Sequence, residues 1–307
     1  MRTAETQIKG KEEIANLRKR GIVTRFHSNM VTVEDEKTGE RFLCRLRGKF
    51  RLQNLRPIVG DRVEYTEDGF GSGIIENILP RKNVLEKPKI ANVDQVILVT
   101  TLKDPDIPPR MIDRFLVLVE KSGLDVVIIF NKIDLLNAED MKRLDELVEI
   151  YSKYYEVLLT SAKRGDGLKE LIDILKGKVS TMAGISGVGK SSLLNAISPG
   201  MRLKTGELSK KLRRGRHTTP CTELLRFSFG GYVADTPGFA NLDISSIDPR
   251  ELKEYFPEFK EVGACEFSDC VHIDEPGCAV KEAVGKIIPE SRYSSYREFF
   301  LEIVGSK

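Results

Sequence analysis

Hydrophobic positions in the first part of the chain recur at short, strand-like intervals. The segments GIVTRF, MVTVED, RFLCRL, DRVEY and GIIENI, between residues 21 and 78, are rich in β-branched or aromatic residues. The turn EKTGE, the Gly60-Asp61 pair and the glycines from Gly69 to Gly73 separate these segments. This pattern predicts a small five-stranded barrel such as an OB-fold, a common platform for oligonucleotides, although an SH3-like barrel would give nearly the same pattern.

Farther along, continuous apolar runs alternate with segments of helical spacing. Residues 81–92, RKNVLEKPKIAN, are charged and are expected to form a linker. Strands are then expected at 93–100, 125–130, 156–160 and 179–184, and helices at 109–122, 138–153, 167–175 and 190–197. Such alternation is typical of a parallel sheet covered on both faces. TELLRFSF and GYVADTPG are expected to add a hairpin to this sheet, and 249–307 to be helical around a Cys/His cluster.

The bulk composition fits a soluble protein of more than one domain. The chain has 307 residues, 40% hydrophobic and 31% charged. We expect domains at 1–82, 83–243 and 244–307. The start MRTAETQIKGKEE has no apolar segment and the longest apolar run is VVIIF, so neither a signal peptide nor a membrane contact is expected. The odd count of 5 cysteines favours a reducing compartment, and the cytoplasm is the expected location.

Basic residues are concentrated in two segments of a nearly neutral chain, whose formal net charge is +3. Segment 41–62 has Asp61 as its only acidic residue beside Arg41, Arg45, Arg47, Lys49, Arg51, Arg56 and Arg62. Segment 202–216 has Glu207 as its only acidic residue beside Arg202, Lys204, Lys210, Lys211, Arg213, Arg214 and Arg216. Such clusters suggest contact with a polyanion, although charge alone fits solvated loops equally well.

The sequence GISGVGKS at 184–191 matches G-x-x-x-x-G-K-[ST] between an expected strand and an expected helix. Glycines in this motif let backbone N–H groups surround phosphate at a helix N-terminus. Lys190 is expected to reach the β- and γ-phosphates, and the Ser191 hydroxyl to bind Mg²⁺. The residues expected to contact the nucleotide here are Gly184, Ile185, Ser186, Gly187, Val188, Gly189, Lys190, Ser191 and Ser192.

NKID at 131–134 follows a buried strand, at the edge of the sheet where ligands bind. The Asp134 carboxylate can accept from guanine N1–H and the exocyclic amine together, a pair of donors that adenine lacks. SAK at 161–163 also follows a strand, and the Ala162 N–H is expected to reach guanine O6. The base-binding residues expected are Asn131, Lys132, Asp134, Ser161, Ala162 and Lys163.

The sequence DTPG at 235–238 completes a GTPase motif set. Asp235 is expected to hold Mg²⁺ through a water molecule, and the Gly238 N–H to meet the γ-phosphate. NKID, the base reader, precedes GISGVGKS, the phosphate loop, in this chain, which is the reverse of the usual GTPase order. Because the same strand ends still face the nucleotide, a circular permutation explains this order and keeps the site.

Three thiols and an imidazole lie close together in the sequence, at Cys265, Cys270, His272 and Cys278. That donor set suits a closed, structural Zn²⁺ site. The spacing differs from the common C-x₂-C pair, so free thiols remain an alternative on spacing alone. Cys44 is expected in the barrel core.

Six motifs along the chain carry a resemblance to a known family: NKID, SAK, GISGVGKSSLLN, GRHTT, DTPGF and CEFSDCVHIDEPGC. Together they resemble the motifs of the ribosome small-subunit-dependent GTPase A (RsgA) family, and the resemblance covers essentially the whole chain. The resemblance implies an α/β protein with an N-terminal OB-fold barrel, a circularly permuted P-loop GTPase domain and a C-terminal helical zinc-binding domain. It also implies one structural Zn²⁺ per chain. Pro220 departs from the family, whose members often continue the threonine run, and puts the mobility of that loop in question.

The resemblance implies GTP hydrolysis that is stimulated by the small ribosomal subunit and acts in its late maturation. Ras-type enzymes orient water with a glutamine after D-x-x-G, but Phe239 stands there in this chain. The resemblance points to His217 as the catalytic histidine; a contact between His217 and ribosomal RNA is the alternative. Thr219 is expected to be the second Mg²⁺ ligand, with Thr218 as the alternative.

The expected partners are the small ribosomal subunit and its rRNA, with no membrane, no DNA and a monomeric chain. The expected ligands are GTP or GDP, Mg²⁺ and Zn²⁺. A competing hypothesis is an RNA-binding module that a nucleotide stabilises, with incidental GTP turnover.

Overall fold

The computed structural model describes residues 18–27, 29–48, 50, 55–86, 89–201, 223–234 and 242–306. By their contacts, the described residues form two compact units. One comprises those of Met1–Val93, Gly177–Val179 and Lys211–Thr236, and the other those of Asp94–Lys176, Ser180–Lys210 and Pro237–Lys307. The expected division into three domains stays a prediction. Within the described ranges, no helix is long and apolar enough to cross a membrane.

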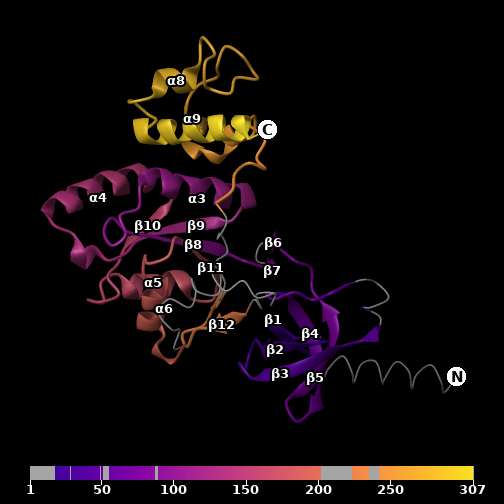
Figure 1. Ribbon diagram of the computed structural model, residues 1–307. Coiled ribbons are helices and arrows are strands. Elements are labelled where there is room, and N and C mark those ends of the chain that lie inside the picture. The colour runs from indigo at the N-terminus through magenta and orange to yellow at the C-terminus, as the bar shows by residue number, and fades with distance from the viewer. Residues whose placement is uncertain are drawn as a thin grey trace. The chain divides into compact units, whose positions relative to one another are not determined.

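The N-terminal strands form a closed barrel with the order β1-β2-β3-β5-β4 (Figure 1). The strands are β1 (Lys19–His27), β2 (Met30–Asp35), β3 (Arg41–Leu46), β4 (Arg62–Gly69) and β5 (Ser72–Ile78). β3 and β5 pair in parallel, and the other neighbours pair antiparallel. This order decides for the OB-fold over the SH3-like alternative. Cys44 lies in the barrel core, fully buried with Val33 and Tyr65, which confirms its expected place.

Residues 81–92 are more ordered than the expected linker. β6 (Val84–Glu86) pairs antiparallel with β7 (Lys89–Ala91). Ile90 and Ala91 are fully buried, and Ile90 also forms a bridge with Val59. The charged residues of this segment therefore concealed an apolar strand, and the linker prediction is wrong.

The expected parallel sheet is confirmed. It comprises β8 (Gln95–Thr100), β9 (Asp125–Phe130), β10 (Glu156–Leu159) and β11 (Val179–Ala183), followed in the strand order β10-β9-β8-β11-β13-β12 by the hairpin of β12 (Leu224–Arg226) and β13 (Tyr232–Ala234). α3 (Pro109–Ser122) and α4 (Ala138–Tyr151) lie on one face of the sheet, and α5 (Leu168–Leu175) and α6 (Lys190–Ile197) on the other (Figure 1). All six residues of β8 are buried, as two covered faces require.

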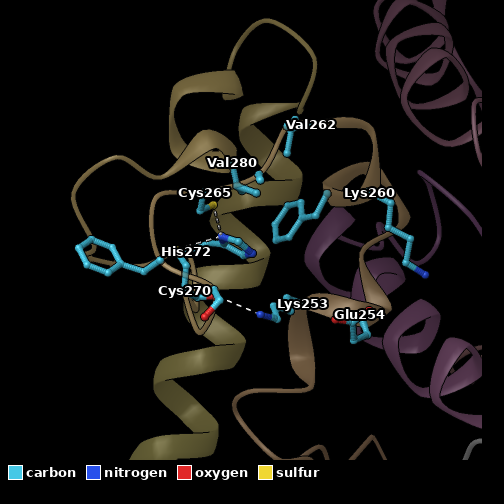
Figure 2. A pocket seen from close by; sticks show the side chains of 13 residues that line it. Lys253, Glu254, Lys260, Val262, Cys265, Cys270, His272 and Val280 are labelled. Atoms are coloured by element: carbon cyan, nitrogen blue, oxygen red, sulfur yellow. Dashed lines mark hydrogen bonds between the residues drawn. The ribbon is translucent and has the colours of Figure 1, made fainter.

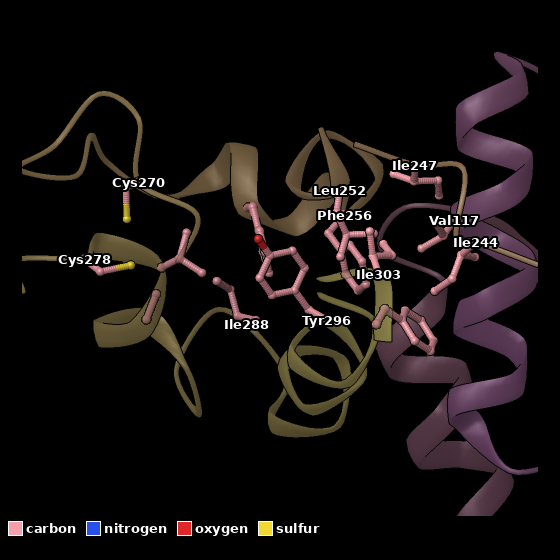
Figure 3. Packing of buried hydrophobic residues seen from close by; sticks show 14 residues of the cluster. Val117, Ile244, Ile247, Leu252, Phe256, Cys270, Cys278, Ile288, Tyr296 and Ile303 are labelled. Atoms are coloured by element: carbon pink, nitrogen blue, oxygen red, sulfur yellow. The ribbon is translucent and has the colours of Figure 1, made fainter. Parts of the chain in front are cut away.

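The C-terminal segment, residues 242–306, has three short helices and one long helix around an apolar cluster (Figure 3). These are the 3-10 helices η3 (Leu252–Tyr255) and η4 (Pro257–Glu261), and the α-helices α8 (Ala279–Ala283) and α9 (Glu290–Gly305). The cluster joins α9 residues such as Tyr296 and Ile303 to Val117 of α3. Because Val117, Phe256 and Tyr296 are all fully buried, this core fixes the C-terminal segment on α3.

A buried ionic network crosses the same contact. Arg292 of α9 donates to Asp113 of α3 at 2.6 Å and to Glu258 of η4 at 2.6 Å. Asp113 also accepts from the hydroxyls of Tyr151 at 2.8 Å and Ser295 at 2.6 Å. Charges removed from water in this way need their partners, so the network fixes the placement of α9 on α3.

Candidate nucleotide and metal sites

The phosphate-loop sequence forms a tight turn between β11 and α6. Gly184 and Gly189 have φ values of 126° and 99°, in the region that favours glycine. A Cβ on Gly184 would lie 2.2 Å from the Val99 carbonyl oxygen, and one on Gly189 would lie 2.3 Å from Asn131 Nδ2. The close approach of the loop to β8 and to the base-reader segment therefore requires glycine at both positions.

Lys190 begins α6 and is only 7% exposed. Its Nζ donates to the carbonyl oxygens of Gly184 and Ile185, both at 2.7 Å. Burial lowers the pKa of Lys190 to about 8. An ammonium group held inside the loop by neutral carbonyls is placed to exchange those acceptors for phosphate oxygens. Ser191, the next residue, is also buried in the first turn of α6.

The base-reader segment contacts the phosphate loop directly. Asn131 Nδ2 donates to the Val188 carbonyl oxygen at 2.8 Å, and Thr160 Oγ1 donates to Asn131 Oδ1 at 3.1 Å. Asn131 is 2% exposed. The structure thus brings NKID, the strand end before SAK and the phosphate loop to one edge of the sheet, although NKID precedes the phosphate loop in the chain.

Asp134 and SAK also lie together. Ser161 Oγ donates to Asp134 Oδ1 at 2.6 Å, and the Arg164 N–H donates to Ser161 Oγ at 3.1 Å. Ala162 and Lys163 lie between these two anchored positions. Lys132 has a positive φ of 63° and its Nζ donates to the Asp104 carbonyl oxygen.

Sequence reasoning missed Thr160 and the loop after β8. Thr160 orients the Asn131 amide, and Asp104 holds Lys132. The same loop lies next to the phosphate loop, because a Cβ on Gly187 would lie 3.5 Å from Pro105 Cδ. The rule that ligands bind beyond the carboxyl ends of parallel strands could have found both, since each follows a strand end.

The remaining expected site residues lie outside the described residues: His217, Thr218, Thr219, Asp235 and Gly238. The described hairpin borders both segments that contain them. β12 begins shortly after the first segment, and β13 ends at Ala234, directly before Asp235.

Cys265, Cys270, Cys278 and His272 converge in the C-terminal segment (Figure 2). His272 Nδ1 lies 3.5 Å from Cys265 Sγ and 3.4 Å from both Cys270 Sγ and Cys278 Sγ, and Cys265 Sγ lies 3.9 Å from Cys278 Sγ. Tetrahedral Zn²⁺, with Zn–S of about 2.3 Å and Zn–N of about 2.0–2.1 Å, would separate sulfur from nitrogen by about 3.6 Å and two sulfurs by about 3.8 Å. The donor set and its spacing therefore fit zinc.

Outer contacts fix the loop that presents His272. The Glu275 carboxylate accepts from the N–H groups of Val271 at 2.7 Å and Ile273 at 2.9 Å. Burial would raise the pKa of Glu275, but these backbone donors hold it below its ordinary value. Tyr293 of α9 donates its hydroxyl to the His272 carbonyl oxygen at 2.9 Å. Such supporting contacts orient metal ligands.

A cavity of about 280 Å³ lies beside the cysteine cluster (Figure 2). Phe259, Phe267 and Val280 line it together with Lys253 and Lys260. Lys253 donates to the Cys270 carbonyl oxygen at 3.1 Å. Because Cys265, Cys270 and His272 also line the cavity, it is part of the surroundings of the candidate metal site.

Comparison with known proteins identifies the family. The family model for the RsgA GTPase matches residues 78–245, and the model for the RsgA N-terminal domain matches residues 20–75. A relative from Thermotoga petrophila, described as small ribosomal subunit biogenesis GTPase RsgA, is 63% identical over 95% of this chain and 99% of its own. A relative of the same description from Carboxydothermus hydrogenoformans is 44% identical over 94% of this chain and 98% of its own.

Solved structures agree over nearly the whole chain. YjeQ from Thermotoga maritima has 59% identity and a TM-score of 0.85, covering 95% of this chain and 100% of that one. YloQ, described as a circularly permuted GTPase, has 37% identity and a TM-score of 0.80, covering 94% of this chain and 96% of that one. These matches confirm the expected resemblance and the expected permutation. The chain therefore belongs to the RsgA family of circularly permuted GTPases, and it is a GTP-hydrolysing enzyme.

Proposed function

We propose that this protein is a Mg²⁺-dependent GTPase that binds the small ribosomal subunit, is stimulated by it and acts in its late maturation. The observation that carries the nucleotide site is the hydrogen bond from Asn131 to Val188, which joins the base reader to the phosphate loop despite the reversed motif order. The ribosomal role is supported by the name of the relatives, small ribosomal subunit biogenesis GTPase RsgA, which cover this chain almost completely.

In this proposal the base is selected by groups that the fold already orients. The Asp134 carboxylate, held by Ser161 Oγ at 2.6 Å, would accept the two guanine donors. The Ala162 N–H would donate to guanine O6. Adenine lacks these two donors and would leave the Asp134 carboxylate without them, which favours GTP over ATP. Lys132 would leave the Asp104 carbonyl oxygen to lie along the base.

The phosphates would bind in the glycine turn before α6. Lys190 would donate to the β- and γ-phosphate oxygens in place of its present carbonyl acceptors. Ser191, Thr219 and Asp235 would hold Mg²⁺, with Thr218 as the alternative to Thr219, and the Gly238 N–H would meet the γ-phosphate. When bound, Mg²⁺ neutralises charge that develops on the phosphates. Lys190 and the backbone N–H groups would supply the rest of that stabilisation.

His217 would orient the attacking water. The chain has 3 histidines: His272 faces the three thiols, and His27 belongs to barrel strand β1. Phe239 has no polar group that could orient water. A histidine in the segment between the phosphate loop and D-T-P-G is therefore the best candidate, and ordering of that segment on the subunit would explain stimulation.

RNA contact would involve the barrel and the C-terminal segment. Arg45 and Arg47 of the barrel have side chains 63% and 50% exposed, and pair with Asp68 and Glu76 respectively; Arg51 lies outside the described residues. The Zn²⁺ would be structural, because three thiolates and an imidazole fill all four positions and leave none open to substrate. Action on ribosomal subunits would place the protein in the cytoplasm.

The test is GTP hydrolysis measured with and without purified small ribosomal subunits. The proposal expects slow turnover alone and strong stimulation by small subunits, but none by large subunits, which are the matched control. The competing RNA-binding module expects subunit binding without stimulation. Equal rates in all three reactions would reject the proposed function.

A further inference from the structure

The β12–β13 hairpin lies between the two segments to which the chemistry is assigned. Glu223 is the first described residue after the segment that contains His217, and Ala234 is the last before Asp235. A displacement of this hairpin therefore moves one end of each segment. Whatever holds the hairpin therefore holds Glu223 and Ala234, the described residues that border these segments.

The barrel holds it through one buried carboxylate. Glu34 of β2 has a side chain only 1% exposed. Its Oε1 accepts from Arg226 Nη1 of β12 at 3.3 Å and from the Tyr232 hydroxyl of β13 at 3.0 Å. Its Oε2 accepts from Arg41 Nε of β3 at 3.0 Å. One carboxylate oxygen thus accepts hydrogen bonds from the hairpin, and the other accepts one from the barrel.

The barrel and the hairpin also approach each other closely at two further places. Gly39, in the turn between β2 and β3, has a φ of 73°, and a Cβ there would lie 2.0 Å from Arg226 Nη1. Arg25 of β1 forms an antiparallel bridge with Glu223, and their side chains form an ion pair at 3.7 Å. The described residues of Lys211–Thr236 accordingly group with the barrel by their contacts.

The chemistry of this contact favours fixed geometry. A carboxylate excluded from water must keep its donors, whereas an exposed pair exchanges them freely. Burial and the nearby Glu34 charge raise the pKa of Tyr232, so its hydroxyl stays protonated and donates. Shifting the barrel without the hairpin would leave Glu34 short of two donors.

We propose that Glu34 is a positioning residue for GTP hydrolysis. Through Arg226 and Tyr232 it transmits the placement of the RNA-bound barrel to the hairpin, and hence to the ends of the segments that contain His217 and Asp235. Stimulation by the small subunit therefore requires this contact, while intrinsic hydrolysis does not. The inference rests on the proposed function.

Tyr232→Phe and Arg226→Met test the contact in the full chain, because each removes a donor to Glu34 from the hairpin side. Single-turnover GTP hydrolysis is measured over a titration of small subunits. The maximal stimulated rate is expected to fall about tenfold in each variant, the equivalent of one hydrogen bond to a charged group. GTP affinity, the intrinsic rate and the subunit concentration at half-saturation are expected to stay within about twofold of wild type.

Tyr65→Phe is the matched control. Tyr65 donates its hydroxyl to Asp35 at 2.7 Å, and it is fully buried within the barrel. The substitution and the hydroxyl–carboxylate contact match those of Tyr232→Phe, but Tyr65 is the more deeply buried of the two and no hairpin residue takes part. Tyr65→Phe is expected to lower the unfolding temperature and to leave the maximal stimulated rate unchanged.

Three outcomes would count against the inference. Stimulated rates in Tyr232→Phe and Arg226→Met within about twofold of wild type would overturn it and leave the proposed function standing. Equal loss of intrinsic and stimulated rates, matched by Tyr65→Phe, would reduce Glu34 to a structural role and overturn it as well. A wild-type enzyme without stimulation would instead refute the proposed function, and this coupling with it.

Discussion

Replacement of Arg292 by methionine gives a sharp test of how the C-terminal segment is held. Arg292 Nε and Nη2 donate to Glu258 at 2.6 and 3.2 Å, and Nη1 donates to Asp113 at 2.6 Å. Methionine preserves much of the apolar volume against the Phe256 ring, which lies 4.7 Å from the guanidinium carbon. Arg292→Met therefore removes the charge and the donors with little change in packing.

The expected loss in the free energy of unfolding of Arg292→Met follows from the burial of this network. The side chains of Arg292, Asp113 and Glu258 are 3%, 0% and 1% exposed, so water cannot replace the lost donors. Asp113 keeps the hydroxyls of Tyr151 and Ser295. Among the described residues, Arg292 is the only side chain that donates to Glu258. Breaking a buried pair from one side costs about 3–5 kcal/mol in the free energy of unfolding, and most of this is expected at Glu258.

The assay is urea unfolding followed by circular dichroism, with Arg110→Met as the control. Arg110 and Glu298 pair between the same two helices, α3 and α9, but their side chains are 58% and 49% exposed. Loss of an exposed pair costs about 0–1 kcal/mol. Adding Glu258→Gln to Arg292→Met is expected to restore part of the stability, because it removes the unpaired charge.

A loss in the free energy of unfolding that is no larger in Arg292→Met than in Arg110→Met would contradict this prediction. A further loss of stability when Glu258→Gln is added to Arg292→Met would contradict it as well, because the unpaired charge would then not be the source of the destabilisation.

The remaining predictions concern the nucleotide and metal sites. Asp134→Asn is expected to lose GTP affinity and gain affinity for xanthosine triphosphate, because an amide donates where xanthine presents an oxygen; retained GTP preference in competition binding would contradict the assignment. GTP affinity is expected to fall as pH rises through about 8, because burial lowers the pKa of Lys190 and phosphate binds its protonated form. Calorimetry should then detect proton uptake on binding above that pH, and a flat profile would argue against a phosphate role for this lysine. Cys270→Ser is expected to lose stoichiometric zinc and loosen the C-terminal segment while nucleotide binding stays nearly intact; wild-type protein without metal by elemental analysis would reject the zinc site. His217→Ala is expected to keep GTP and subunit affinity but lose stimulated hydrolysis by about 100-fold or more. Wild-type single-turnover rates on saturating subunits would instead make His217 an RNA contact.

Most of the elements, and the chemistry that each one presents, follow from the sequence alone. Apolar runs of strand length alternating with helical periods predicted the parallel sheet, because these periodicities reflect which faces a chain must bury. The nucleotide-binding motifs GISGVGKS and NKID could be recognised because each is contiguous and directly follows a strand. The cysteine cluster was recognisable for the same reason, since Cys265 and Cys278 lie close together in the chain. The strand at Ile90 was not predicted, because it has charged neighbours and is too short to show an alternation of apolar and polar residues.

Which distant groups meet depends on how the elements pack in three dimensions. Asn131 and Val188 are 57 residues apart, Arg292 and Asp113 are 179 apart, and Arg226 and Glu34 are 192 apart. A single arginine, glutamate or threonine carries no sign of its partner, because a side-chain contact depends on how whole elements pack rather than on local spacing. Burial is decided in the same way: Glu34 lies in a strand next to the equally acidic Asp35 and Glu36, and only barrel closure and the hairpin remove its carboxylate from water.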